Sequence, residues 1–135
     1  MAWVSPTAHN DPESSWGDEA NSYDDDTGTY AVSNSSDFLE FTIPEDTYDK
    51  IRVWARWPAY GDLDIDIYYG GAWHDVYQGS FNDDDWTEKS FSVQTLTKYR
   101  VRLIRGSGIM RLYETDANEC EAPAVVGRSF GAIIG

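Results

Sequence analysis

The chain has 135 residues, of which 41% are hydrophobic and 15% aromatic, and its formal net charge is −14 at pH 7. This length and apolar content suffice for one globular domain with a core and exclude a disordered chain. The acidic balance excludes binding to nucleic acid through phosphate contacts and opposes docking on anionic membranes. We therefore expect neither as a partner.

Residues 1–28 are rich in Ser, Asn, Asp, Pro and Gly without a period of 3.6 or 2, which predicts an N-terminal arm and an ordered loop. The segment leads into "YDDDTGTYA", residues 23–31, with three consecutive aspartates. A tight loop that packs Asp24, Asp25 and Asp26 beside Thr27 and Thr29 offers the oxygen ligands that calcium prefers. Without a cation, the run must spread into solvent, helped by an Asx turn at Asp26. Both interpretations stay open.

Alternating apolar and polar residues predict strands through the next segment, residues 29–116. The clearest is 63–69, where Leu63, Ile65 and Ile67 alternate with aspartates before the hairpin glycines Gly70 and Gly71. The full set of predicted strands is 29–32, 37–43, 50–57, 63–69, 72–78, 86–93, 98–105 and 109–115.

About eight short strands with turn signals between them, and no helical pattern, predict an all-β fold. We expect an antiparallel β-sandwich or jelly roll with extended N- and C-terminal arms, and a closed barrel as the second choice. The domain then spans 29–116, between the arm and loop of 1–28 and an apolar C-terminal arm at 117–135.

Basic residues concentrate in three of these strands: Arg52, Arg56, Arg100, Arg102, Arg105 and Arg111. The polar face of another strand carries Asp62, Asp64 and Asp66. Opposite charges on neighbouring strands stabilise a sheet, which predicts a ladder of cross-strand ion pairs. The alternative is that some of these arginines hydrogen-bond the hydroxyls or carboxylate of a ligand.

Catalytic constellations are not visible in the sequence: there is no nucleophile with its base, no metal triad and no phosphate loop. We expect a protein that is not an enzyme. The many aromatic residues point instead to binding, since exposed rings stack on the faces of sugars. Trp57, Tyr60 and Trp86 are the candidate ligand-binding residues because they lie near predicted turns.

The stretch "SYDDDTGTYA" resembles the loop that opens discoidin-type (coagulation factor type C-like) domains, and the resemblance continues through "LDIDIYYGGAWHDVYQGSF" and "KYRVRLIR" to "LYE". It implies a β-sandwich jelly roll that binds carbohydrate or lipid headgroups through loops at one end, with a structural calcium ion. Carried over by position, the implied metal ligands are Asp24, Asp26, Thr29 and Glu114. Asp25 replaces the family's turn glycine, and Ala31 replaces its tryptophan.

The tail "APAVVGRSFGAIIG" is apolar and has one charged side chain, Arg128. An exposed apolar end is an aggregation liability, so we expect it to dock on a neighbouring subunit. Folding back on its own sandwich is the alternative. The predicted assembly residues are Trp3 and Val4 in the N-terminal arm and Val125, Val126, Phe130, Ile133 and Ile134 in the C-terminal arm.

The opening "SPTAHNDPESSWGDEANSYDDDTGTYA" also resembles short modules of bacteriophage structural proteins. The expected function is accordingly that of a structural protein: an accessory or decoration protein of a phage virion, homo-oligomeric and docked on capsid or tail proteins. The alternative is a carbohydrate-binding module that recognises glycans, with an extracellular location.

Overall fold

A computed structural model describes residues 2–33 and 35–121. Short strands occupy the N-terminal segment, and the longer strands that follow form the body of the sandwich. The strands are β1 (Ala2–Val4), β2 (Ala8–Asn10), β3 (Trp16–Gly17), β4 (Ala31–Ser33), β5 (Phe38–Arg56), β6 (Gly61–Tyr69), β7 (Ala72–Gly79), β8 (Asp85–Arg105) and β9 (Met110–Glu119). Two short 3₁₀ turns, η1 (Glu19–Tyr23) and η2 (Pro58–Tyr60), are the helical elements of this part of the chain, and neither is long enough to span a membrane.

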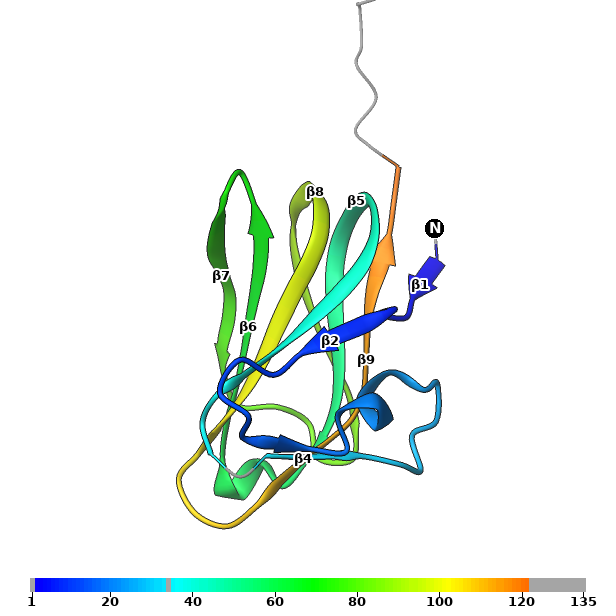
Figure 1. The fold of residues 1–135 in the computed structure, drawn as a ribbon. Coiled ribbons are helices and arrows are strands. Elements are labelled where there is room, and N and C mark those ends of the chain that lie inside the picture. The colour runs from blue at the N-terminus through cyan, green and yellow to red at the C-terminus, as the bar shows by residue number, and fades with distance from the viewer. Residues whose placement is uncertain (1, 34, 122–135) are drawn as a thin grey trace, which may run out of the picture.

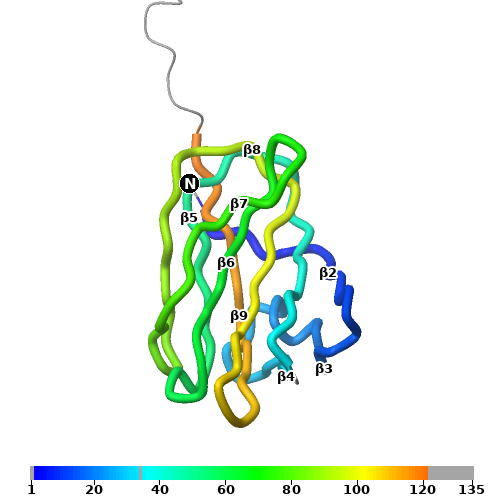
Figure 2. Tube along the Cα trace, turned by 90° about the vertical axis from the view of Figure 1, so that its left-hand side faces the viewer, coloured from blue at the N-terminus to red at the C-terminus, as the bar shows by residue number. Residues whose placement is uncertain are grey.

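The nine strands form one sheet: seven follow the order β3-β4-β9-β5-β8-β6-β7, and of the other two β1 pairs with β9 and β2 with β5. Every pairing is antiparallel. The sheet folds over itself into two layers, so that the molecule is a β-sandwich (Figures 1 and 2). The predicted fold class is therefore confirmed.

Two long bent strands join the layers. The first part of β5, from Phe38 to Thr42, pairs with the end of β8, whereas its second part, from Lys50 to Ala55, pairs with the start of β8. Register shifts separate the two parts, at Thr42/Asp46 and Tyr48/Lys50. The sequence predicted two strands in each of these regions, and in the structure each pair is one strand that bends from one layer into the other.

The core lies between the layers and is built from the alternate residues that the sequence predicted. Leu63 and Ile65 are fully buried, as are Val53 of β5 and Val101 of β8. The hydroxyl of Tyr99 lies 2.9 Å from Oγ1 of Thr115, so that a buried hydrogen bond links β8 of one layer to β9 of the other. Satisfied polar pairs of this kind fix the relative position of packed elements.

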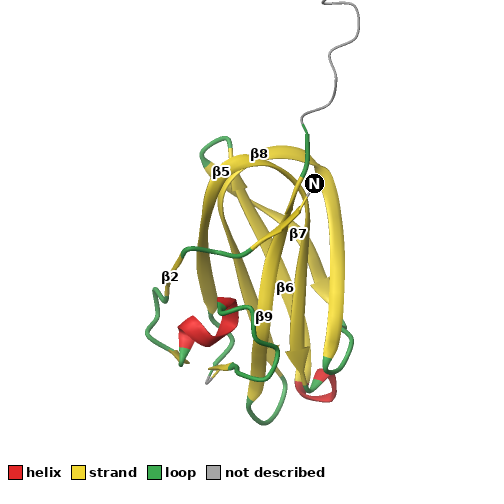
Figure 3. Ribbon diagram, turned by 90° about the vertical axis from the view of Figure 1, so that its right-hand side faces the viewer, coloured by secondary structure: helices red, strands yellow, loops and turns green. Residues whose placement is uncertain are grey.

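The N-terminal segment was predicted as an arm and a loop, but three of its parts form strands. Trp3 and Val4 lie in β1, where they pair with Asn118 and Ala117 of β9. Val4 also packs against the core. The predicted assembly residues Trp3 and Val4 are thus part of the chain's own sheet. Figure 3 shows the strands of the sheet in yellow and the 3₁₀ turns in red. Val125, Val126, Phe130, Ile133 and Ile134 lie outside the described residues.

Candidate functional site

Three connections gather at one end of the sandwich, opposite the end at which β9 finishes (Figure 1). They are the β5–β6 connection with η2, the β7–β8 connection at 80–84 and the β8–β9 connection at 106–109. We call this group the end loops. Because loops on a rigid scaffold tolerate variation, binding residues concentrate at such positions.

Trp57 and Tyr60, both predicted as ligand-binding residues, lie together in the end loops. Their ring centroids are 5.8 Å apart. Trp57 has a φ of +87°, a conformation that costs free energy for a residue with a side chain. Tyr60 is 39% exposed, which makes it one of two large exposed hydrophobic residues in the described part of the chain; the other is Ile109 of the neighbouring loop, at 50%.

A cleft of about 370 Å³ adjoins Tyr60, between η2 and the β8–β9 connection. Residues 58–62 and 104–107 line it. The carbonyl of Tyr60 accepts hydrogen bonds from the amides of Gly106 (2.5 Å) and Ser107 (3.1 Å), which fixes one loop against the other. Gly61 permits this approach, because a Cβ there would lie 1.8 Å from the carbonyl oxygen of Ile104.

Trp86, the third predicted ligand-binding residue, lies outside the end loops, on the outer face of β8. Its ring meets that of Trp54 edge to face, with centroids 5.5 Å apart, and the guanidinium of Arg52 lies 3.9 Å from its centroid. The structure links it to Trp57 indirectly. Asp84 accepts a hydrogen bond from Nε1 of Trp54 (3.2 Å) and forms an ion pair with Arg56 (3.0 Å), the residue before Trp57.

Arg111 contacts Trp57 and brings two tyrosines, Tyr30 and Tyr113, close to the site. The sequence left a ligand-binding role open for Arg111 as one of six arginines and did not indicate the two tyrosines. The guanidinium of Arg111 lies 4.5 Å from the ring centroid of Trp57 and 4.2 Å from that of Tyr30. Tyr30 and Tyr113 pack against each other at 5.2 Å. The arginines that alternate along the predicted strands allowed a ligand-binding role for some of them, but the pattern did not indicate which one.

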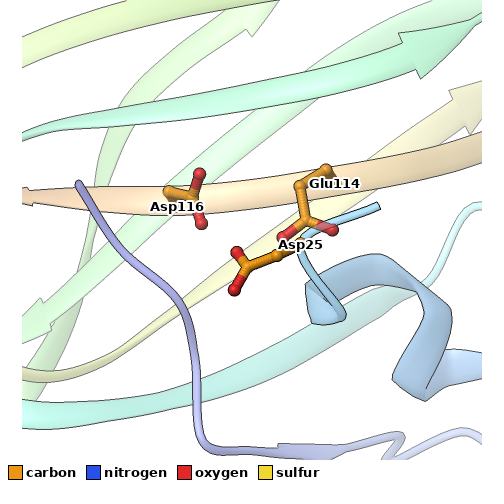
Figure 4. A group of neighbouring side chains, drawn as sticks. All are labelled: Asp25, Glu114 and Asp116. Carbon is orange, nitrogen blue, oxygen red and sulfur yellow. The ribbon is translucent and has the colours of Figure 1, made fainter. Parts of the chain in front are cut away.

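A second group lies where the aspartate run meets β9. Carboxylate oxygens of Asp25, Glu114 and Asp116 lie within 4.8 Å of one another, as Figure 4 shows. Glu114 is 2% exposed, and no described residue donates a hydrogen bond of standard geometry to its carboxylate, although the backbone amide of Asp25 lies close enough to lower its pKa. Burial, followed by the charge of Asp116, raises the pKa of Glu114 to about 8. An ionised carboxylate buried in this way is costly unless a cation compensates it.

The other predicted metal ligands point into their own loop. Asp24 accepts hydrogen bonds from the hydroxyl of Thr29 and the amide of Asp26, and Asp26 accepts one from the amide of Gly28 at 2.7 Å. These bonds are the Asx turns that the sequence offered as the alternative to a cation. Of the predicted set, only Glu114 belongs to the carboxylate cluster, and Asp25 faces it instead of Asp24 or Asp26.

Asp116 is held differently from Glu114. The guanidinium of Arg52 donates to Asp116 from both Nε (3.0 Å) and Nη2 (2.8 Å), and the hydroxyl of Ser5 donates at 3.3 Å. Burial still raises the pKa of Asp116, and the hydrogen bonds from Arg52 oppose that rise. In this cluster Asp116 therefore has a counter-ion, Arg52, whereas Glu114 has none among the described residues.

The cross-strand ion pairs predicted from the arginine pattern are present. Arg100 pairs with Asp66 at 2.9 Å and Arg102 with Asp64 at 2.6 Å, from β8 to β6. Asp64, Asp66 and Asp75 also bring carboxylate oxygens within 4.8 Å of one another. Because two arginines already neutralise this group, we interpret it as part of the ion-pair ladder.

No protein-family model matches the chain, and no curated protein matches it in sequence. Solved structures do resemble it. The CBM32 of AlyQ in complex with 4,5-unsaturated mannuronic acid has a TM-score of 0.72 at 14% identity, and the match covers 89% of this chain and all of that one.

Two further solved structures resemble the chain. A pectin-binding carbohydrate-binding module has a TM-score of 0.69 at 16% identity, covering 88% of this chain and 94% of that one. The family 32 module of NanJ from C. perfringens, in complex with galactose, has a TM-score of 0.66 at 12% identity, covering 87% of this chain and all of that one. At such identities the likeness shows the fold, a discoidin-like β-sandwich.

Proposed function

We propose that the chain is a carbohydrate-binding module that holds glycans at its end loops. The observation that carries the proposal is the Trp57–Tyr60 pair, held on a strained backbone beside a cleft. Rigid aromatic faces bind sugar rings with little loss of side-chain entropy, and a fixed cleft adds shape selection. Solved structures with this fold are modules described as bound to a sugar or as pectin-binding, which supports the proposal.

A glycan array followed by titration calorimetry tests this function. We expect Trp57→Ala and Tyr60→Ala each to weaken binding by about tenfold or more, as for loss of one stacking residue. Trp73→Ala is the matched control, because Trp73 forms a similar aromatic pair with Tyr68 at 5.1 Å on β6 and β7. Binding that depends on Trp73 and not on Trp57 would place the site elsewhere. Failure of the chain to bind any glycan would overturn the proposal.

We also propose that calcium occupies the cluster of Asp25, Glu114 and Asp116. The carboxylate of Glu114 is buried without a counter-ion or a hydrogen bond of standard geometry among the described residues, which favours a cation there, and an all-oxygen donor set suits calcium. When bound, the ion acts as the counter-ion of the Glu114 carboxylate and connects the aspartate run to β9. Asp25 and Glu114 would be its ligands, whereas Asp116 keeps Arg52 as its partner.

Thermal unfolding in EDTA and in millimolar calcium tests the metal proposal. A ligand that binds the native state raises the melting temperature, so we expect calcium to stabilise the chain and Glu114→Gln to abolish the difference. Asp75→Asn, in the other aspartate group, is the control and should leave the effect of calcium unchanged. Equal melting temperatures for the unaltered chain in both conditions would refute a calcium site.

The predicted role in a phage virion has less support than the carbohydrate function. The similar solved structures include carbohydrate-binding modules and a truncated AlyQ with CBM32 and alginate lyase domains, of which the match covers 35%. Trp3 and Val4 pair within the chain's own sheet. Attachment to a virion, with capsid or tail partners and a homo-oligomeric state, stays a prediction. So does an extracellular location.

A further inference from the structure

Two arginines face each other beside the proposed glycan site. Arg56 of β5 and Arg111 of β9 are direct cross-strand partners. Like charges at directly opposed positions destabilise a sheet unless an anion compensates them. Asp84 supplies a carboxylate for Arg56 at 3.0 Å. The nearby phenol of Tyr113, followed by Asp84 and Asp83, raises the pKa of that guanidinium.

Arg111 has no such compensation. Within residues 2–33 and 35–121 no carboxylate lies within 4.0 Å of its guanidinium, whereas Arg52, Arg56, Arg100 and Arg102 each have an aspartate. Its contacts there are the two rings and one hydrogen bond, from Nη1 to the hydroxyl of Tyr113 at 3.3 Å. Carboxylates are plentiful in a chain with 24 acidic and 10 basic residues, so the lack of one at the guanidinium of Arg111 among the described residues leaves its charge open to an external anion.

The rings leave the edge of Arg111 available. Tyr30 and Trp57 lie 4.2 and 4.5 Å from the guanidinium, and Arg111 remains partly exposed. Because a guanidinium carries five N–H groups, one bond to Tyr113 leaves a pair that can hold a carboxylate in a fork. Aromatic contacts fix the orientation of that fork, so little entropy is lost when an anion binds.

We propose that Arg111 binds the carboxylate of an acidic sugar, so that the site takes uronate-containing glycans in preference to neutral ones. This inference rests on the proposed carbohydrate function. A uronate carries its carboxylate beside the ring, and Arg111 lies against Trp57, the residue on which the ring stacks. Neighbouring groups then recognise the face of the sugar and its charge, because Trp57 contacts both Arg111 and Tyr60, which lines the cleft.

Calorimetry with oligogalacturonates, oligomannuronates and oligoglucuronates tests this, each compared with its methyl ester, which has the same sugars without the charge. We expect at least one uronate to bind about tenfold or more tightly than its ester. Arg111→Gln should remove that preference and leave binding of the ester nearly unchanged. Lys89→Gln is the control for loss of one positive charge, since Lys89 lies over Tyr77, 3.9 Å from its centroid, and contacts no residue of the site.

The outcomes separate the two proposals. If uronate and ester bind equally, or if Arg111→Gln weakens both to the same degree, the role of Arg111 in charge recognition is refuted and carbohydrate binding stands. If the chain binds neither the uronates nor any neutral glycan of the array, both proposals fail. Arg111→Lys adds a further check: a lysine keeps the charge but not the fork, so we expect it to restore the preference only in part.

Discussion

The ring centroid of Trp3 lies 4.3 Å from the guanidinium of Arg52, and that of Trp86 lies 3.9 Å from the same guanidinium. The first strand of the chain is thereby held on the outer face of the sheet, over a guanidinium that also pairs with Asp116. The N-terminal segment is thus an integral part of the sandwich, and it links two tryptophans that are 83 positions apart in the sequence.

Trp3→Ala should destabilise the fold by about 1–2 kcal/mol, because it removes a stacking partner of Arg52 and apolar contact area. Urea unfolding measures this change. Thr7→Ala, in the same segment but with a weak hydrogen bond of 3.4 Å, is the control and should have a smaller effect. If Trp3→Ala leaves stability unchanged, β1 contributes nothing to the isolated chain and the assembly role predicted for Trp3 regains support.

Gly61→Ala should cost about 2–4 kcal/mol, as strongly strained substitutions at close backbone approaches do. The added Cβ would meet the carbonyl of Ile104, so β6 and β8 must separate at the cleft. Thermal unfolding checks the loss of stability. The control is Gly17→Ala, because a Cβ at Gly17 meets nothing within 4 Å. Equal stability of the two variants would contradict the close packing of the end loops.

The stability of the calcium-free protein should fall as the pH rises from about 4.5 to about 8. The pKa of Glu114 is raised from 4.5 to about 8 in the folded chain, so across this range the folded state holds a proton that the unfolded state has released. Asp66 and Asp116, whose pKa values are also raised, act in the same direction.

Chemical denaturation in EDTA at several pH values measures the effect. Glu114→Gln cannot ionise, so its stability should depend less on pH than that of the unaltered chain. A profile as steep as that of the unaltered chain would show that the burial of Glu114 does not set the pH dependence.

Much of the fold could be predicted because alternation is a local signal. The alternation of Leu63, Ile65 and Ile67 predicted β6, and Gly70 and Gly71 predicted the hairpin that joins it to β7. The predicted bounds of β6 agree with the structure to within a few residues. The joining of the predicted strand pairs into β5 and β8 could not be predicted in this way. A bent strand interrupts its own alternation at the bend, around Pro44 in β5, and so has the sequence pattern of two strands.

The candidate site was predictable only in part, since it depends on register. Trp57 and Tyr60 were identified by their position near a turn. Arg111 lies opposite Arg56 because the pairing of β5 with β9 shifts register between Trp54 and Ala55. The local sequence pattern does not predict such a bulge. The position of Asp25 beside Glu114 was not predictable either, because it depends on the left-handed backbone conformation of Asp25, with a φ of +61°.

The most direct test of the central claim is to titrate the protein with a glycan that binds in the array and to follow the indole N–H signals of the six tryptophans by NMR. We predict that the signal of Trp57 shifts with the ligand. The signals of Trp16, which is buried and donates from Nε1 to the carbonyl of Asp37 at 3.0 Å, and of Trp73 on β7 should stay in place. A shift of Trp73 with Trp57 unmoved would contradict a glycan site at the end loops.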